Sequence, residues 1–122
     1  MKAHGVLHAE LNRHIARLGH TDTFVIADCG LPIPQHVPVV DLALVFGIPR
    51  FVEACQAMLN EVVIEQVTVA TETPPEVREL FDAVTEVPHE KLKELVADAA
   101  FVVRTGETTP YANAIFHCGV PF

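Results

Sequence analysis

The sequence has no tryptophan, a single tyrosine and only three cysteines among its 122 residues. Cys29, Cys55 and Cys118 are odd in number and form no C-x-x-C pair, which argues against a disulfide framework and against a zinc site. We therefore expect the thiols to be reduced and the protein to reside in the cytoplasm. No apolar run approaches the roughly 20 residues of a membrane span, and no secretory signal follows Met1.

Basic residues are also scarce. Eight Lys and Arg stand against sixteen Asp and Glu, a formal net charge of −8, which argues against nucleic-acid partners and anionic membranes because both need a basic surface. The phosphate-binding motifs G-x-x-x-x-G-K-[ST] and G-x-G-x-x-G and the G-x-S-x-G elbow are absent, so nothing indicates a nucleotide cofactor or a serine nucleophile. Half the residues are hydrophobic, enough for one domain, residues 1–122, with a core of its own.

Helical and strand patterns alternate along the chain. Leu11, Ile15 and Leu18 recur at helical spacing and predict a helix over 9–18, ended by Gly19. Apolar periodicity predicts further helices over 48–62, 74–84 and 89–99, and strands over 24–30, 39–44, 66–72, 101–107 and 113–120. This alternation indicates an α/β fold whose largely parallel sheet is covered on both faces.

Two ionisable residues bracket the first predicted strand. His20 precedes the strand and Asp28 ends it, at the carboxyl edge where such sheets bind ligands. Eight residues of extended chain span about 26 Å. Either the loop at His20 folds back, or the two residues act in sites built from more than one subunit.

Other polar residues cluster late in the chain. Residues 104–113, RTGETTPYAN, include Arg104, Glu107, Tyr111 and Asn113; Tyr111 and Asn113 share a face if the chain is extended. His89 precedes a predicted helix. Seven histidines occur without HExxH or another ligand motif, so no metal site is expected. What remains is acid–base chemistry on a small polar molecule, or binding without chemistry; turn and cap roles are the structural alternatives for these residues.

Several stretches carry a resemblance to a known family. They are KAHGVL at 2–7, LGHTDTFVIADCGLPIP at 18–34, His89 with Lys93 four residues on, VVRTGETTPYAN at 102–113 and GVPF at 119–122. In this order they resemble the D-ribose pyranases over essentially the whole chain. The related L-fucose mutarotases are less similar, because GLPIP and PYAN favour the ribose branch. The chain is somewhat shorter than is typical of this family, and the missing residues fall within 71–90.

The resemblance implies a three-layer α/β/α fold with a mostly parallel mixed sheet, and no metal or organic cofactor. It implies a homo-oligomer, typically a ring-based decamer, with sites between subunits, that interconverts the β-pyranose and β-furanose forms of D-ribose. His20 matches the family's proton donor. The sugar-contacting positions are matched by Asp28, His89, Lys93, Tyr111 and Asn113. A mutarotase for another aldose such as L-fucose, a non-catalytic sugar-binding accessory of a transport system and a structural assembly protein are the alternatives.

Overall fold

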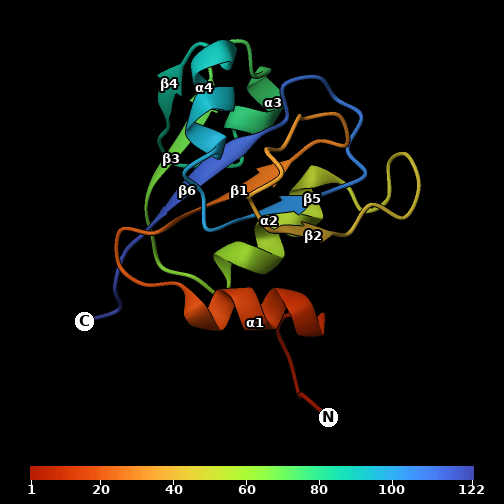
Figure 1. Cartoon of the computed structure of the whole chain (residues 1–122), viewed down its shortest axis with the longest axis vertical. Coiled ribbons are helices and arrows are strands. Elements are labelled where there is room, and N and C mark those ends of the chain that lie inside the picture. The colour runs from red at the N-terminus through yellow and green to blue at the C-terminus, as the bar shows by residue number, and fades with distance from the viewer.

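The computed structural model describes residues 1–122, which form four helices and six strands (Figure 1). The elements are α1 (Ala9–Arg17), β1 (Thr23–Ala27), β2 (Val39–Asp41), α2 (Phe51–Leu59), β3 (Ile64–Ala70), α3 (Pro75–Arg78), β4 (Thr85–Val87), α4 (His89–Val96), β5 (Phe101–Arg104) and β6 (Ala114–Cys118). None of the helices is long and apolar enough to cross a membrane.

The six strands form one mixed sheet in the order β2-β5-β1-β6-β3-β4. β1 and β2 each pair with β5 in parallel, and β4 pairs with β3 in parallel. β6 alone runs against its neighbours, β1 and β3. The mostly parallel mixed sheet expected from the sequence is therefore confirmed, and the carboxyl ends of five strands meet at one edge.

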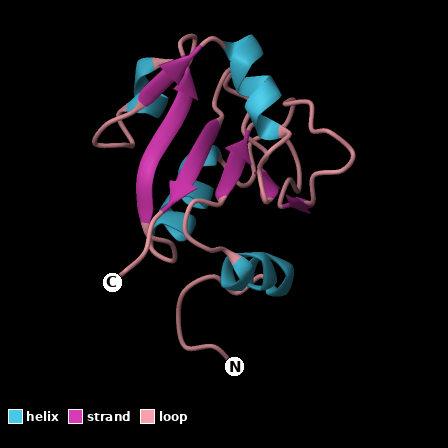
Figure 2. Cartoon of the chain, turned by 60° about the vertical axis from the view of Figure 1, so that its left-hand side comes forward, coloured by secondary structure: helices cyan, strands magenta, loops and turns pink.

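The sheet separates two hydrophobic clusters, as three-layer packing requires (Figure 2). On one face, Phe24 stacks between Phe101 and Phe116, with ring centroids 5.5 and 5.0 Å away, and α2 covers these rings. On the other face, Leu92 and Val96 of α4 pack into the second cluster. β1 contributes alternate side chains to both clusters, which explains why residues 24–27 are all buried.

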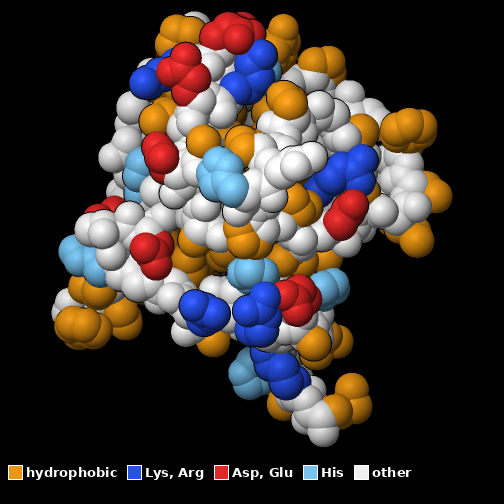
Figure 3. Space-filling view, in the orientation of Figure 1, with side chains coloured by type: hydrophobic (Ala, Val, Ile, Leu, Met, Phe, Trp, Pro, Cys, Tyr) orange, Lys and Arg blue, Asp and Glu red, His pale blue; other side chains and the backbone are white.

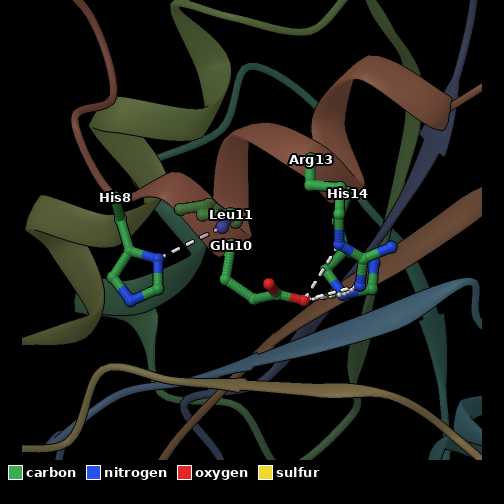
Figure 4. Close-up of polar contacts among 5 residues, drawn as sticks. All are labelled: His8, Glu10, Leu11, Arg13 and His14. Atoms are coloured by element: carbon green, nitrogen blue, oxygen red, sulfur yellow. Dashed lines mark hydrogen bonds and ion pairs between the residues drawn. The ribbon is translucent and has the colours of Figure 1, made fainter.

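Helix α1 lies below the sheet in Figure 1, at the end opposite to those carboxyl ends. His8 caps it: Nδ1 accepts a hydrogen bond from the backbone N–H of Leu11 at 3.1 Å (Figure 4). Glu10 contacts both Arg13 and His14 on the next turn. His14 lies against the ring of Phe101, with centroids 4.9 Å apart, so this histidine is a packing residue at the edge of the core.

The helix predicted over 74–84 is wrong in length, because α3 covers only Pro75–Arg78. Arg78 explains the early end: its guanidinium donates to the carbonyls of Thr71 and Thr73, at 2.7 and 2.8 Å, and pairs with Glu86. These contacts tie the helix to the turn after β3 and to β4, a short strand that the sequence patterns did not predict. Phe81 then turns its ring edge-on to Phe116 in the core.

Candidate functional site

A cavity of about 450 Å³ lies at the carboxyl edge of the sheet. Asp28 enters it after β1, His89 at the start of α4, and Tyr111 and Asn113 just before β6. Four of the six residues predicted to form the site therefore line one cavity. The remaining lining residues are Cys29, Gly30, Leu31, Pro32, Phe46, Glu107, Thr108 and Pro110.

Asp28 and Asn113 form a reciprocal hydrogen-bonded pair. The backbone N–H of Asp28 donates to Oδ1 of Asn113 at 2.9 Å, and Nδ2 of Asn113 donates to Oδ2 of Asp28 at 3.1 Å. Gly30 N–H donates to the other carboxylate oxygen at 2.9 Å, the Asx-type turn considered from the sequence. Asn113 is only 1% exposed, so the pair holds the carboxylate in one orientation. Each of its oxygens keeps acceptor capacity for a ligand hydroxyl.

His89 and Tyr111 form the aromatic part of the cavity. Their rings meet edge to face, with centroids 5.0 Å apart and planes at 80°. Nδ1 of His89 is buried and has no hydrogen-bond partner. A buried nitrogen without a partner costs free energy unless a ligand or water completes it, so His89 is poised to accept or donate one hydrogen bond at the cavity wall. The backbone N–H of His89 donates to Glu72 at 3.1 Å.

Lys93 lies one helical turn beyond His89 on α4 and does not line the cavity. Its Nζ pairs with Glu90 at 2.8 Å. The structure thus places Lys93 beside the predicted site without bringing it into the cavity, and its predicted contact with a sugar stays a prediction.

His20 lies at the opposite end of β1 from Asp28, and its loop does not fold back to the cavity. Its side chain is 50% exposed, and Nε2 contacts Oε1 of Glu65 at 3.0 Å. His20 instead lines a second cavity, of about 460 Å³, with Val62, Val63 and the chain end at 119–122. Within one chain, the predicted proton donor and the predicted sugar-binding residues are therefore separate.

Glu107 is the cavity residue to which sequence reasoning assigned no role. Burial raises the pKa of its carboxyl, but hydrogen bonds from the backbone of Phe51, Thr108 and Thr109 and from the Thr109 hydroxyl outweigh burial and hold that pKa below its usual value. Glu107 is consequently an anion at neutral pH. Its position in RTGETTPYAN was the available signal; its contacts with Phe51 were not visible, because 56 residues separate the two.

An exposed apolar loop borders the cavity. Leu44 and Phe46 are 77% and 84% exposed, and Val45 and Ile48 are also exposed. The loop projects at the right of Figure 1, in yellow, and orange side chains mark the same edge in Figure 3. Its backbone rests on Gly106, where a Cβ would lie 2.5 Å from the carbonyl of Val45, so only glycine permits this approach.

No three His, Cys, Asp or Glu side chains come together in a geometry that could hold a metal ion. The polar side chains that line the Asp28 cavity are the Asp28 carboxylate, the His89 imidazole, the Tyr111 phenol, the Asn113 amide, the Thr108 hydroxyl, the Cys29 thiol and the anionic Glu107. Hydrogen-bonding groups of this kind on an aromatic wall match the surface of a small molecule with several hydroxyls.

Comparison with known proteins agrees with this chemistry. The family model described as the RbsD / FucU transport protein family matches residues 1–121. A D-ribose pyranase from Corynebacterium glutamicum (strain R) is 56% identical over the whole of both chains. The solved structure of Bacillus subtilis RbsD complexed with D-ribose is 41% identical, covers all of both chains and has a TM-score of 0.94.

A more distant solved structure shares the fold. The fucose mutarotase from Streptococcus pneumoniae, in complex with L-fucose, is 19% identical, with 95% of each chain covered and a TM-score of 0.78. The fold expected from the sequence is confirmed by these matches, as is the resemblance to D-ribose pyranases. The chain belongs to the RbsD / FucU transport protein family.

Proposed function

We propose that this chain is a D-ribose pyranase, an isomerase that interconverts the β-pyranose and β-furanose forms of D-ribose. The observation that carries the proposal is the cavity at the carboxyl edge of the sheet, which gathers Asp28, His89, Tyr111 and Asn113. Sequence identity of 56% to a D-ribose pyranase and of 41% to a ribose-bound RbsD, each over the full length, supports the choice of sugar.

The reaction needs only proton transfers. Opening the pyranose ring requires a proton on the ring oxygen and removal of one from the anomeric hydroxyl; rotation of the open aldehyde and attack by another hydroxyl then close the five-membered ring. A histidine side chain can both give and take a proton near neutral pH. One positioned acid or base accelerates such a step by roughly 10²–10⁴-fold, which suffices for a reaction that already proceeds in water.

We assign His20 as the general acid. Asp28, held by Asn113 and Gly30, accepts hydrogen bonds from sugar hydroxyls. His89 is the complementary base, because its Nδ1 has no hydrogen-bond partner within the chain. The oxygen that carries negative charge during ring opening would be stabilised by Lys93. Tyr111 and Asn113 recognise the hydroxyl pattern of ribose.

These roles require a second subunit. His20 and Asp28 lie at opposite ends of β1, so His20 of one copy must reach the cavity of another. The exposed side chains of Phe46, which lines the cavity, and of Leu44 on the same loop supply an apolar surface of the kind that subunit interfaces bury. We propose a homo-oligomer, a ring-based decamer as in the family resemblance, in the cytoplasm, where the three free cysteines would stay reduced.

Mixed oligomers test the shared site. His20→Ala and Asp28→Asn should each be inactive alone, but in oligomers reassembled from a 1:1 mixture about one site in four should have both intact residues, because donor and acceptor subunits are drawn independently. Activity near a quarter of wild type supports sites between subunits. Complete inactivity of reassembled mixtures would show that each site lies within one chain.

Proton NMR of equilibrated D-ribose tests the activity itself. Saturation of a pyranose anomeric signal should transfer to the furanose signals faster when the protein is present, and His20→Ala should abolish the gain. Ribose binding without faster exchange would identify a sugar-binding accessory instead. Faster exchange only with L-fucose would identify a mutarotase for another aldose, and neither binding nor exchange with any aldose would leave a structural role.

A further inference from the structure

The loop between β5 and β6, residues 105–113, carries Tyr111 and Asn113 into the cavity. We call it the Tyr111 loop. Tyr111 has a φ of 63°, a left-handed conformation that residues other than glycine adopt only when the surroundings enforce it. Two side chains hold this loop, Glu107, which lines the cavity, and the buried Thr73, and neither has a role in the reaction as assigned above.

Glu107 holds the start of the loop. Its Oε2 accepts hydrogen bonds from the backbone N–H groups of Thr108 and Thr109, at 3.1 and 3.2 Å, and from the Thr109 hydroxyl at 3.0 Å. Its Oε1 accepts from Phe51 N–H at 3.1 Å, the first residue of α2, where a negative charge also stabilises the helix. With three donors, Oε2 has no capacity left for a sugar hydroxyl.

The same residue reaches the other side of the cavity through its backbone. The carbonyl of Glu107 accepts a hydrogen bond from Cys29 N–H at 2.9 Å, next to Asp28. Glu107 therefore joins three segments that are far apart in sequence: the start of α2, the Tyr111 loop and the turn after β1.

Thr73 holds the centre of the loop. It is almost completely buried, and its hydroxyl donates to the carbonyl of Tyr111 at 2.9 Å. Thr73 is itself fixed, because Arg78 donates to its carbonyl at 2.8 Å. The residue with the left-handed backbone is thus tied to the turn after β3, on the far side of β6 from Asp28.

We propose that Glu107 and Thr73 are positioning residues that clamp the Tyr111 loop in the geometry that binds sugar, an inference that rests on the proposed pyranase function. They act through Tyr111 and Asn113, whose loop they hold. Without the clamp, the loop would have to be ordered by each arriving sugar, and the cost would appear as weaker binding.

The composition provides a direct probe of the loop. Tyr111 is the only tyrosine and the chain has no tryptophan. The tyrosine band of the near-ultraviolet circular dichroism spectrum therefore reports on Tyr111 alone, while the far-ultraviolet spectrum reports on the fold. A variant that loses the tyrosine band but keeps the far-ultraviolet spectrum has therefore changed only in this loop.

Three variants and one control separate positioning from general stability. Thr73→Val keeps the shape of the side chain and removes one hydrogen bond; Glu107→Ala removes four; and Glu107→Gln keeps an oxygen for the loop. Glu53→Gln is the control, because Glu53 is in the first turn of the same helix but pairs only with the exposed Arg50.

We expect Thr73→Val and Glu107→Ala to raise the ribose concentration for half-maximal exchange roughly tenfold, the ratio that corresponds to the net free energy of about one hydrogen bond. Both should weaken the tyrosine band and leave the far-ultraviolet spectrum unchanged. Glu107→Gln should recover most of the band, and Glu53→Gln should match wild type throughout.

Thr73→Val and Glu107→Ala with wild-type half-saturation and a wild-type tyrosine band would overturn the clamp; if Glu107→Ala does not fold, Thr73→Val decides. A wild-type protein that leaves ribose exchange unaccelerated would refute the proposed function instead. The tyrosine bands would still show whether Glu107 and Thr73 hold the loop, so the two failures are distinguishable.

Discussion

Asn113→Asp is the sharpest test of the paired geometry at the cavity. The substitution keeps size and shape, and the new carboxylate can still accept the hydrogen bond from Asp28 N–H. Its second oxygen, however, replaces the Nδ2 that lies 3.1 Å from Oδ2 of Asp28. Two unit charges at that separation repel by about 5 kcal/mol at an effective dielectric constant of about 20. Water at the half-buried Asp28 and small shifts reduce this, and we expect about 2–3 kcal/mol of destabilisation near pH 7.

The pH dependence of this variant identifies the cause. Because both carboxylates cannot remain ionised so close together, one pKa of the pair rises in the folded state above the roughly 3.9 of an unfolded Asp. The folded state then binds more protons than the unfolded chain. Stability relative to wild type is therefore greatest near pH 4 and falls as pH rises toward the raised pKa, by up to about 1.4 kcal/mol per pH unit.

Urea denaturation near pH 5 and pH 7, at one fixed protein concentration, measures this slope. Asn113→Ala is the matched control: it loses both hydrogen bonds to Asp28 but adds no charge, so its deficit relative to wild type should not grow with pH. Equal deficits for Asn113→Asp at both pH values would refute the assigned contact between Asn113 and Asp28.

Three further outcomes are expected. His20→Ala should lower the ribose exchange rate measured by NMR by roughly 10²–10⁴-fold, with an unchanged circular dichroism spectrum; a near-normal rate would remove His20 from catalysis. Burial against Phe101 and the charge of Arg13 lower the pKa of His14, so its contribution is complete above about pH 6.5 and is lost as pH falls through the lowered pKa; urea midpoints of His14→Leu should fall less on acidification than those of wild type. Leu92→Ala, at a fully buried position of α4, should cost about 2–5 kcal/mol in the same denaturation assay, and a smaller loss would mean that α4 relaxes onto the sheet.

Much of the fold could be read from local pattern. The stretch around Phe24 was predictable as a buried strand because apolar β-branched residues run unbroken there, and Leu92 and Val96 show the spacing of a helix with one buried face. The short α3 could not be read in this way. Apolar spacing continues through Phe81, but the contacts of Arg78 with carbonyls after β3 end the helix, and these contacts are tertiary.

The candidate site, like the fold, could be predicted only where local pattern determines it. Asp28 could be placed because it ends a predicted parallel strand, and the carboxyl ends of such strands form binding edges. The pairing of Asp28 with Asn113, 85 residues later, depends on β6 lying next to β1, an adjacency that periodicity does not encode. Glu107 stands out in the sequence as part of a polar stretch, but its hydrogen bond to the first residue of α2 could not be predicted from local pattern.

β1 itself explains why the histidine and the aspartate are so far apart. All four residues from Phe24 to Ala27 are buried between two hydrophobic clusters, so the strand is a rigid spacer that neither loop can shorten. A two-fold dimer that joined His20 of each copy to Asp28 of the other would need one self-complementary surface along the whole strand. A head-to-tail contact needs only the His20 end of one copy to meet the Asp28 end of the next, and repeated head-to-tail contacts close into rings. If His20 and Asp28 share a site between subunits, as proposed above, their placement favours a ring over an isolated two-fold dimer, and catalysis depends on assembly.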